Sequence, residues 1–328
     1  MSELASESSD MSRRWGITLP LTGVPLAAHR ALVRELPGLG YTDAWSAETA
    51  GTDAFTPLAL VAEWAPELRL GTAIVPVYTR GAGLLAMQAA TLAEFAPGRF
   101  VLGIGTSTPV IVEGWNGVAF TEPYARTRDT VRFLRSALAG DKITHTYPTF
   151  SVTKFRLERP PQPPPQLMIA ALRPGMLRLA AREADGAITN WLAPSDVPKV
   201  RAELGPDREL VARIFVCPTE DIDAARALGR LLISSYLTVP VYAAFHDWLG
   251  RGELLRPMHE AWAAGDRAAA NAAIPDEVVD DLVVHGTVDA CRERIASYVD
   301  AGLDTPAIAL LPTGEDPMTL VRGLAPKG

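Results

Sequence analysis

The chain has 328 residues, of which 48% are hydrophobic and 21% charged, and its formal net charge at pH 7 is −7. This composition is typical of a globular protein with a large core, and the negative charge argues against nucleic acid as a partner. No apolar run approaches the roughly 20 residues that cross a bilayer, and the two cysteines lack the spacing of a zinc site or disulfide framework. The sequence therefore predicts a cytoplasmic protein without a metal site or a membrane segment.

The chain begins with a polar, acidic stretch, MSELASESSDMSRR, that lacks the apolar core of a secretory signal. We expect residues 1–14 to form a disordered tail and residues 15–328 to form one domain.

Predicted strands and helices alternate from residue 15 onwards. Strands are expected at residues 15–19, 40–45, 68–75, 99–104, 167–171, 184–189, 210–216 and 306–311. Helices are expected at residues 26–36, 55–64, 84–95, 123–138, 175–182, 194–204, 220–236 and 288–301. Eight strands that each pair with a helix predict the α/β class and a (β/α)8 TIM barrel.

Two segments interrupt this repeat, after the fourth and the seventh strands. Residues 141–165 contain an alternating stretch and then a proline run, which predicts extended chain with a stiff return to the fifth strand. Residues 239–275 read as added helix. Insertions of this kind commonly form lids or substrate walls.

Residues 68–108 form the clearest unit, because two apolar strands joined by a helix predict a parallel βαβ arrangement. The strand ends carry Ala73, Ile74 and Val75 in the first case and Gly105, Thr106 and Ser107 in the second. Ligands of parallel α/β folds bind at such carboxyl ends, and glycine lets the backbone approach a planar molecule closely.

A turn at Arg173, Pro174 and Gly175 leads from the fifth strand into a helix that begins near Met176. The free N–H groups at a helix start bind anions, and Arg173 adds positive charge, so the turn is a candidate phosphate site. A plain turn with proline at the first helical position is the alternative.

Other strand ends carry further candidates. Glu48 follows the second strand, where a carboxylate is costly to bury without a partner. Arg80 either orients a substrate or pairs with a structural carboxylate, and Trp191 either lines a ligand or packs in the core. The five histidines lack metal-ligand spacing; we expect His29 at the surface and place His246 in the second insertion.

Three segments carry a family resemblance: GTAIVPVYTR at 71–80, GRFVLGIGTS at 98–107, and LRPGMLRLAAREADGAITNWLAP at 172–194. They resemble the luciferase-like flavin and deazaflavin oxidoreductases, and most closely the actinobacterial oxidoreductases that depend on coenzyme F420. The resemblance covers residues 15–215 well and the remainder weakly.

The resemblance implies coenzyme F420 as cofactor, with FMN as the alternative, and gives the candidate residues their roles. The cofactor phosphate would bind at the turn from Arg173 to Met176, and a cis peptide between Ala73 and Ile74 would back the ring. The remaining residues expected around the ring and the ribityl chain are Trp45, Glu48, Val75, Gly105, Thr106, Ser107, Asn190 and Trp191.

The resemblance also bears on the reaction. Thr49 and Thr108 stand where the sugar-phosphate dehydrogenase branch of the family has histidine and glutamate. Without that pair, removal of a hydroxyl proton is difficult. We therefore expect hydride transfer between C5 of the deazaflavin and a small organic substrate, with reduction of an activated C=C or C=N bond. Glu48 and Thr49 are the candidate catalytic residues, with Thr49 or water as proton donor.

Two alternatives remain open: an FMN-dependent two-component monooxygenase of the same fold, and a non-catalytic flavin- or deazaflavin-binding protein. The expected partners are a small-molecule substrate and a second copy of the chain. A separate F420 or flavin reductase is a further candidate partner.

Overall fold

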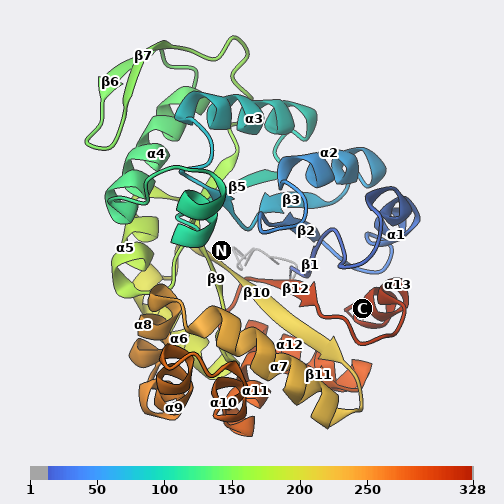
Figure 1. Cartoon of the computed structure of the whole chain (residues 1–328). Helices are drawn as coiled ribbons and strands as arrows, with labels where there is room; N and C mark the ends of the chain where they lie inside the picture. Colours follow the sequence, from blue (N-terminus) through green and yellow to red (C-terminus); the bar gives the residue numbers. More distant parts are fainter. Residues whose placement is uncertain (1–13, 327–328) are drawn as a thin grey trace, which may run out of the picture.

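The computed structural model describes residues 14–326 (Figure 1). Within them, eight parallel strands close into a barrel, because the last strand pairs with the first. These strands are β1 (Gly16–Thr18), β2 (Asp43–Ser46), β3 (Arg69–Thr72), β5 (Phe100–Gly105), β8 (Gln166–Ala170), β9 (Gly186–Asn190), β10 (Glu209–Pro218) and β12 (Thr305–Leu310). The predicted (β/α)8 TIM barrel is confirmed.

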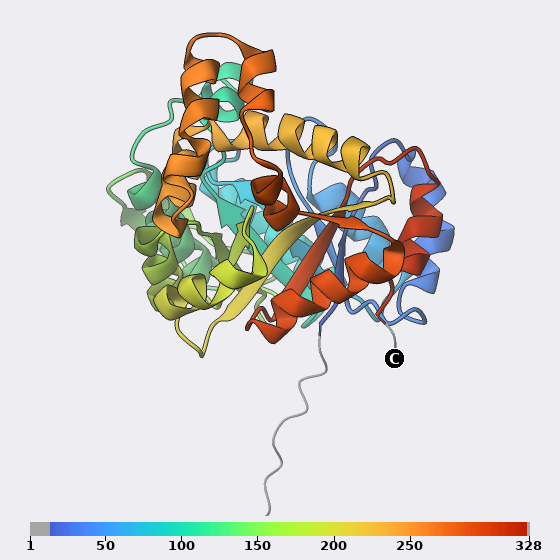
Figure 2. The same cartoon turned by 90° about the horizontal axis from the view of Figure 1, so that it is seen from below.

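Helices surround the barrel, as two directions of view show (Figures 1 and 2). They include α1 (His29–Glu35), α2 (Phe55–Trp64), α3 (Ala82–Phe95), α4 (Pro123–Leu138), α5 (Pro174–Glu183), α6 (Val197–Leu204), α7 (Ile222–Leu237) and α12 (Val288–Asp300). The short 3-10 helices η1 (Leu26–Ala28) and η3 (Pro194–Asp196) precede α1 and α6, and the π-helix η2 (Val110–Trp115) precedes α4. Helices α2 and α4 begin and end at the predicted residues.

The two insertions lie at separate places on the rim (Figure 1). The first is an antiparallel hairpin of β6 (Ile143–Thr146) and β7 (Ser151–Phe155), in the segment where the alternating pattern predicts extended chain. The second consists of α8 (Pro240–Leu249), α9 (Gly252–Ala263) and α10 (Arg267–Ala272). None of the described helices alone has the length and apolarity to cross a bilayer; α7 and α8 meet that test together, but bend by 109°.

The structure also contains elements that the sequence analysis missed. They are β4 (Val75–Pro76), α11 (Asp276–Leu282), β11 (Val283–Gly286) and α13 (Pro317–Gly323). Elements this short span too few residues to show a clear periodicity. The predicted strand at 68–75 is interrupted, since β3 ends at Thr72 and the chain resumes as β4.

The predicted tail at residues 1–14 lies outside the described residues, apart from Arg14. The Arg14 guanidinium lies 3.4 Å from the carboxylate of Asp43 at the start of β2. Arg14 thus joins an ion-pair network at the amino end of the barrel.

Charged side chains close this end of the barrel. Arg69 pairs with Asp43 and also donates to Glu209, with 2.8 Å between Nη1 and Oε2. Thr305 donates to the same glutamate at 2.8 Å. Burial alone would raise the pKa of Glu209, but the hydrogen bonds and charge of Arg69 outweigh it and lower that pKa.

A single-atom change tests this network. We expect Glu209→Gln to lower the free energy of unfolding by about 2 kcal/mol at pH 7, because charge-assisted hydrogen bonds are lost. The depressed pKa makes the contribution of Glu209 complete above the unfolded-state value, about 4.3, and removes it as the pH falls through the folded-state value. Urea unfolding of both proteins should therefore show a difference that shrinks in acid; a constant difference would contradict this.

The middle of the barrel is filled by the Trp45 indole. It packs with Val101, Met168, Ile188, Val211 and Ala307, and the residue has no exposed surface. Glycine at position 71 makes room, because a Cβ there would lie 2.1 Å from the ring. Trp45 is therefore a core residue, which corrects its predicted contact with a cofactor.

Candidate active site

Strand β3 ends in a bulge at the carboxyl end of the barrel. The peptide bond between Ala73 and Ile74 is cis, as predicted. The Thr72 hydroxyl bridges the interrupted ladder: it donates to the Gly103 carbonyl and accepts from the Gly103 N–H, both at 2.8 Å. Pairing with β5 resumes at Val75, opposite Ile104.

The bulge exposes a small apolar surface at the barrel mouth. Ala73 and Ile74 are half-buried. A Cβ at Gly105 would lie 2.7 Å from the Ala170 Cβ and 3.0 Å from the Ile74 Cδ1, so glycine is needed where these strand ends meet. Val75 is fully buried in the core, which corrects its predicted contact with a cofactor.

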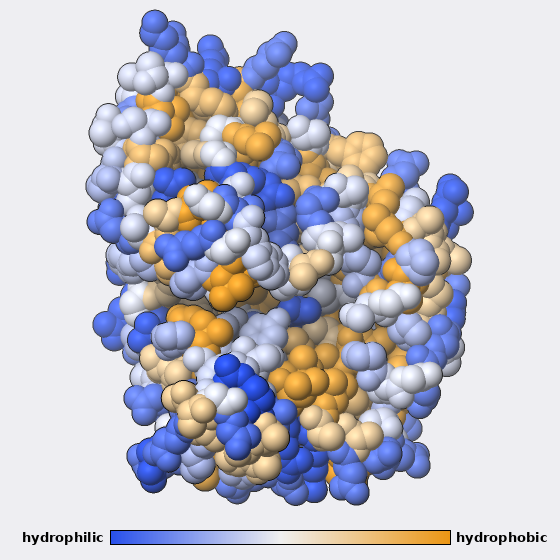
Figure 3. All heavy atoms as spheres, viewed as in Figure 1, coloured by the Kyte–Doolittle hydropathy of each residue, from blue (hydrophilic) through white to orange (hydrophobic). Residues whose placement is uncertain are grey.

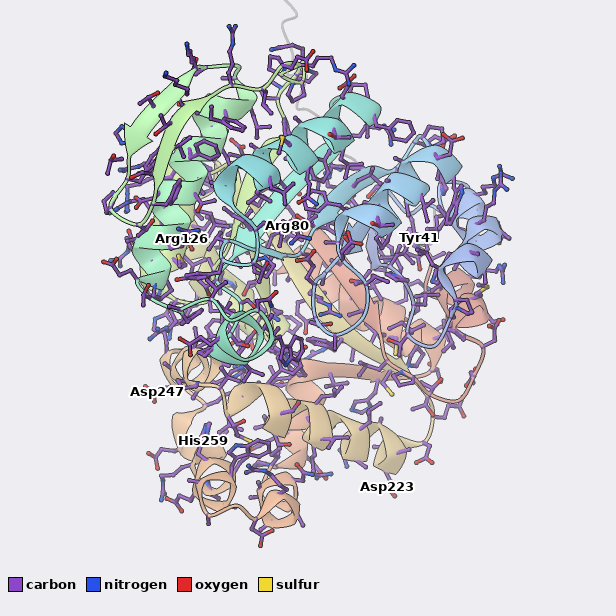
Figure 4. The ribbon with its side chains drawn as sticks, turned by 45° about the horizontal axis from the view of Figure 1, so that its top comes forward. Tyr41, Arg80, Arg126, Asp223, Asp247 and His259 are labelled. Carbon is purple, nitrogen blue, oxygen red and sulfur yellow. The ribbon has the colours of Figure 1, made fainter. Side chains whose placement is uncertain are left out.

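Glu48 is engaged by Arg80 through two hydrogen bonds, one of them 2.6 Å from Nη1 to Oε2. The Ala54 N–H donates to the same carboxylate at 3.0 Å. Both charged side chains are largely buried, while Thr49 is exposed. Of the two readings of Arg80, which Figure 4 labels, the structure supports pairing with a structural carboxylate, and the pair joins the segments that follow β2 and β4. A catalytic role for Glu48 and Thr49 stays a prediction.

Helix α5 begins at the predicted turn. Arg173 is the exposed N-cap residue, Pro174 follows, and no side chain caps the free N–H groups. No atom lies within 4 Å of a Cβ built at Gly175, so a ligand has space there, beside half-buried Met176. Arg178, about one turn along, pairs with Glu203 at 2.7 Å.

Thr106 and Ser107 follow β5 and are half-buried. Ser107 has a φ of 61°, so the chain turns sharply at this strand exit. The two residues lie beyond Gly105, at the same carboxyl edge of the barrel as the bulge. A role for them beside a ribityl chain stays a prediction.

The end of β9 faces the second insertion. The Asn190 amide donates to the Tyr242 hydroxyl of α8 at 3.1 Å. Trp191 is buried and stacks on Phe215 with 4.1 Å between ring centroids. It therefore packs in the core behind Asn190, which corrects its predicted place against the cofactor ring.

Tyr242 is a candidate that the sequence analysis missed. Burial raises the pKa of its hydroxyl to about 12, so the group stays protonated at neutral pH. Asn190 donates to its oxygen, and no acceptor for its own proton occurs within residues 14–326. The sequence does predict that the insertion at 239–275 lines a substrate site. Only the fold shows that Tyr242 is the side chain of this insertion that reaches the end of a barrel strand.

Arg213 is the second residue that was missed. It lies on β10 in register with Asn190 and Ala307. Its Nε is buried without a hydrogen-bond partner in the described chain, and its guanidinium lies 5.1 Å from the Phe215 ring centroid. The sequence signal was an arginine inside an otherwise apolar strand.

Two histidines, His29 and His246, lie in the core. His29 is buried, not at the surface as expected, because its Nε2 accepts a hydrogen bond from the Leu21 N–H at 2.8 Å. His246 is fully buried on α8, and burial together with the charge of Arg251 lowers its pKa to about 3. No group of three or more metal-ligating side chains occurs in residues 14–326.

Two surface grooves lie away from the barrel mouth. One of about 380 Å³ lies on α8 and α9 beside Asp247 and His259, which Figure 4 labels. The other, about 540 Å³, lies between Arg126 and the β7 strand. Neither is lined by a barrel strand, so the strand ends remain the candidate site. On the face seen in Figure 3, apolar residues form several separate patches among polar ones, and one of the larger patches lies just below the centre.

Comparison with known proteins agrees with this architecture. A Mycobacterium tuberculosis protein, provisionally named as a coenzyme F420-dependent oxidoreductase, is 27% identical over 310 residues, covering 85% of this chain and 89% of the relative. The coenzyme F420-dependent tetrahydromethanopterin reductase of Methanopyrus kandleri has a similar structure, with a TM-score of 0.78, 18% identity, and coverage of 95% of this chain and 97% of that one.

Two further structures have the same fold. An F420-dependent secondary alcohol dehydrogenase in complex with an F420–acetone adduct gives a TM-score of 0.74 at 16% identity, covering 96% of this chain and 98% of the other. The oxygenating constituent of 3,6-diketocamphane monooxygenase from Pseudomonas putida, in complex with FMN, gives 0.67 at 14% identity, covering 96% and 97%. At such identities the likeness shows the fold alone.

The family model described as luciferase-like monooxygenase matches residues 11–305. That range contains the first seven strands of the barrel and their helices, and it ends at the first residue of β12. With the barrel and its bulge at Ala73–Ile74, the match establishes that the chain belongs to the luciferase-like monooxygenase family of enzymes.

Proposed function

We propose that this protein is a coenzyme F420-dependent oxidoreductase that transfers a hydride to a small organic substrate. The observation that carries the proposal is the pairing of two features at one edge of the barrel. The half-buried bulge at Ala73–Ile74 offers an apolar support for a planar ring, and the uncapped start of α5 offers N–H groups for a phosphate. The names of the F420-dependent relatives support the choice of cofactor.

The residues at this edge fit such a cofactor. Ala73 and Ile74 would back the ring, Gly105 keeps the strand ends free of a clashing Cβ, and the α5 start has open space at Gly175. Thr106 and Ser107 would lie along the ribityl chain. Because the protein carries a net charge of −7, an anionic cofactor needs local donors such as Arg173. When bound in its reduced form, F420 supplies a hydride from C5.

We propose that the substrate is reduced at an activated C=C or C=N bond and that Tyr242 supplies the accompanying proton. Reduction of such a bond adds one hydride and one proton, and the Tyr242 hydroxyl is protonated and lacks an acceptor in the described chain. The threonines at positions 49 and 108 still disfavour oxidation of a sugar phosphate. Tyr242 takes precedence over Thr49 or water as the proton donor because Asn190 holds it beside the strand ends.

An FMN-dependent monooxygenase is the second candidate, and the FMN-bound structural neighbour favours it. F420 and FMN share a tricyclic ring, a ribityl chain and a phosphate, so the same residues would hold either one. A non-catalytic binding protein is the third candidate. A cytoplasmic location, a homodimer and a separate reductase remain predictions.

Titration of the purified protein with F420 and, separately, with FMN tests the cofactor. Trp45 lies directly below the mouth, so a bound ring should quench its fluorescence by energy transfer. We expect micromolar binding of F420 and little response to FMN. The reverse preference would assign the protein to the monooxygenases. Binding of reduced F420 that no acceptor reoxidises would indicate the non-catalytic alternative.

A matched pair of variants tests the phosphate turn. Arg173→Met should weaken F420 binding about tenfold, because a charge-assisted contact with the phosphate is lost. Arg178→Met removes the same charge one turn along, from a side chain that pairs with Glu203, and should leave the affinity unchanged. Equal effects of both variants on the dissociation constant would argue for a general charge effect instead.

A further inference from the structure

Arg213 points into the barrel mouth. Val211, two residues earlier on β10, belongs to the buried layer around Trp45. Alternate residues of a strand face the same side, so Arg213 also faces the interior, one layer nearer the carboxyl end. Two neighbouring positions in the ladders, Asn190 and Ala307, lie level with it.

The positive charge of Arg213 has no counter-charge in the described chain. Carboxylates pair with Arg69, Arg80 and Arg251, whereas none pairs with Arg213 within residues 14–326. The Arg213 Nε is buried and makes no hydrogen bond within residues 14–326. Arg213 as a whole is half-buried, so a ligand at the mouth can reach its guanidinium, and an anionic group there would supply the missing counter-charge.

The surroundings of Arg213 suit one kind of ligand group. Its guanidinium lies over the Phe215 ring, with 5.1 Å from Cζ to the centroid, so the ring supports it on one side. Asn190 is beside it in the ladder, and Tyr242, hydrogen-bonded to Asn190, adds a free hydroxyl proton. A planar fork matches the two oxygens of a carboxylate.

We propose that Arg213 binds a carboxylate of the substrate and that the physiological substrate is therefore an unsaturated or imino acid. This inference rests on the proposed function, since the bound acid would be the hydride acceptor. The cofactor phosphate has a separate place at the start of α5, which follows β8, whereas Arg213 lies two strands further around the barrel. Tyr242 beside the carboxylate would then face the bond that is reduced.

Binding of small anions tests the proposal. We would titrate the protein, at constant ionic strength and both with and without F420, with benzoate, with benzamide as its neutral match, and with inorganic phosphate. We expect benzoate to bind at least about tenfold more tightly than benzamide, because a charge-assisted pair is gained. Arg213→Met should abolish this preference, and Arg213→Lys should retain part of it. Arg178→Met, whose charge lies on the surface, is the control and should retain it fully.

Several results would overturn the inference. These are equal binding of benzoate and benzamide, no binding of either, or a benzoate preference that survives in Arg213→Met. An Arg213-dependent preference for phosphate over benzoate would exclude the carboxylate assignment. A tenfold loss of F420 affinity in Arg213→Met would make the residue a cofactor contact instead. The titrations without cofactor separate this test from the proposed function, which fails only if F420 does not bind or is not reoxidised.

Discussion

Replacing Gly103 with alanine is expected to lower the free energy of unfolding by at least about 3 kcal/mol and to abolish binding of F420. A Cβ at this position would lie 1.9 Å from the Thr72 carbonyl oxygen and 2.4 Å from the Ile188 Cδ1. The first of these atoms is backbone and cannot rotate away. The strands must therefore separate where the Thr72 hydroxyl joins them, and the bulge at Ala73–Ile74 would move with them.

Urea unfolding and F420 titration would measure the two effects. Gly51→Ala is the matched control, since a Cβ at Gly51 meets no atom within 4 Å, and it should change neither quantity. If Gly103→Ala does not fold, two changes at Thr72 isolate the bridge. Thr72→Ser keeps the hydroxyl and should bind F420 normally, whereas Thr72→Val removes it and should bind weakly. Normal stability and binding in Gly103→Ala would show that the bulge does not depend on this contact.

Replacing Tyr242 with phenylalanine is expected to slow the oxidation of reduced F420 by an unsaturated acceptor about 100-fold, while F420 affinity stays unchanged. The variant loses one oxygen atom, and with it the proposed proton donor. Because burial raises the pKa of Tyr242 to about 12, the acid form persists across the neutral range. Loss of the Tyr242 proton should therefore not lower the wild-type rate until the pH approaches 12.

Single-turnover kinetics with the best C=C or C=N acceptor found by screening would measure the effect. Tyr236→Phe is the matched control: its ring lies 5.8 Å from that of Tyr242, and its hydroxyl is not part of the Asn190 contact. A Tyr242→Phe rate within about threefold of wild type would return the proton donor to Thr49 or water.

Much of the barrel could be predicted from local patterns. Apolar strands and amphipathic helices repeat along the chain, and capping and turn residues mark ends well enough that α2 and α4 were placed correctly. The turn at Arg173 that begins α5 was also predictable, because proline fixes its φ near the helical value and so favours the first position of a helix. The position of the cis peptide came from the family resemblance and is confirmed.

Which side chains reach the mouth was not predictable in the same way. Trp45, Val75 and Trp191 follow or end strands, as ligand-binding residues do, yet all three are buried in the core. The sequence assigns a residue to a strand end, but the closed barrel decides whether it points into the mouth, into the filled interior or towards a helix. That choice depends on the register between strands that are distant in sequence.

The sequence by itself determined the fold class, the order of the eight barrel strands and their main helices, and the turns at which an anion or a planar ring could bind. Only the tertiary structure decided that Glu48 pairs with Arg80, that Tyr242 of the second insertion meets Asn190, and that Arg213 faces the mouth unpaired. Periodicity and turn chemistry act over a few neighbouring residues, so a single sequence displays them. Ion pairs, burial and orphaned hydrogen-bond donors depend on segments that come together only when the barrel closes.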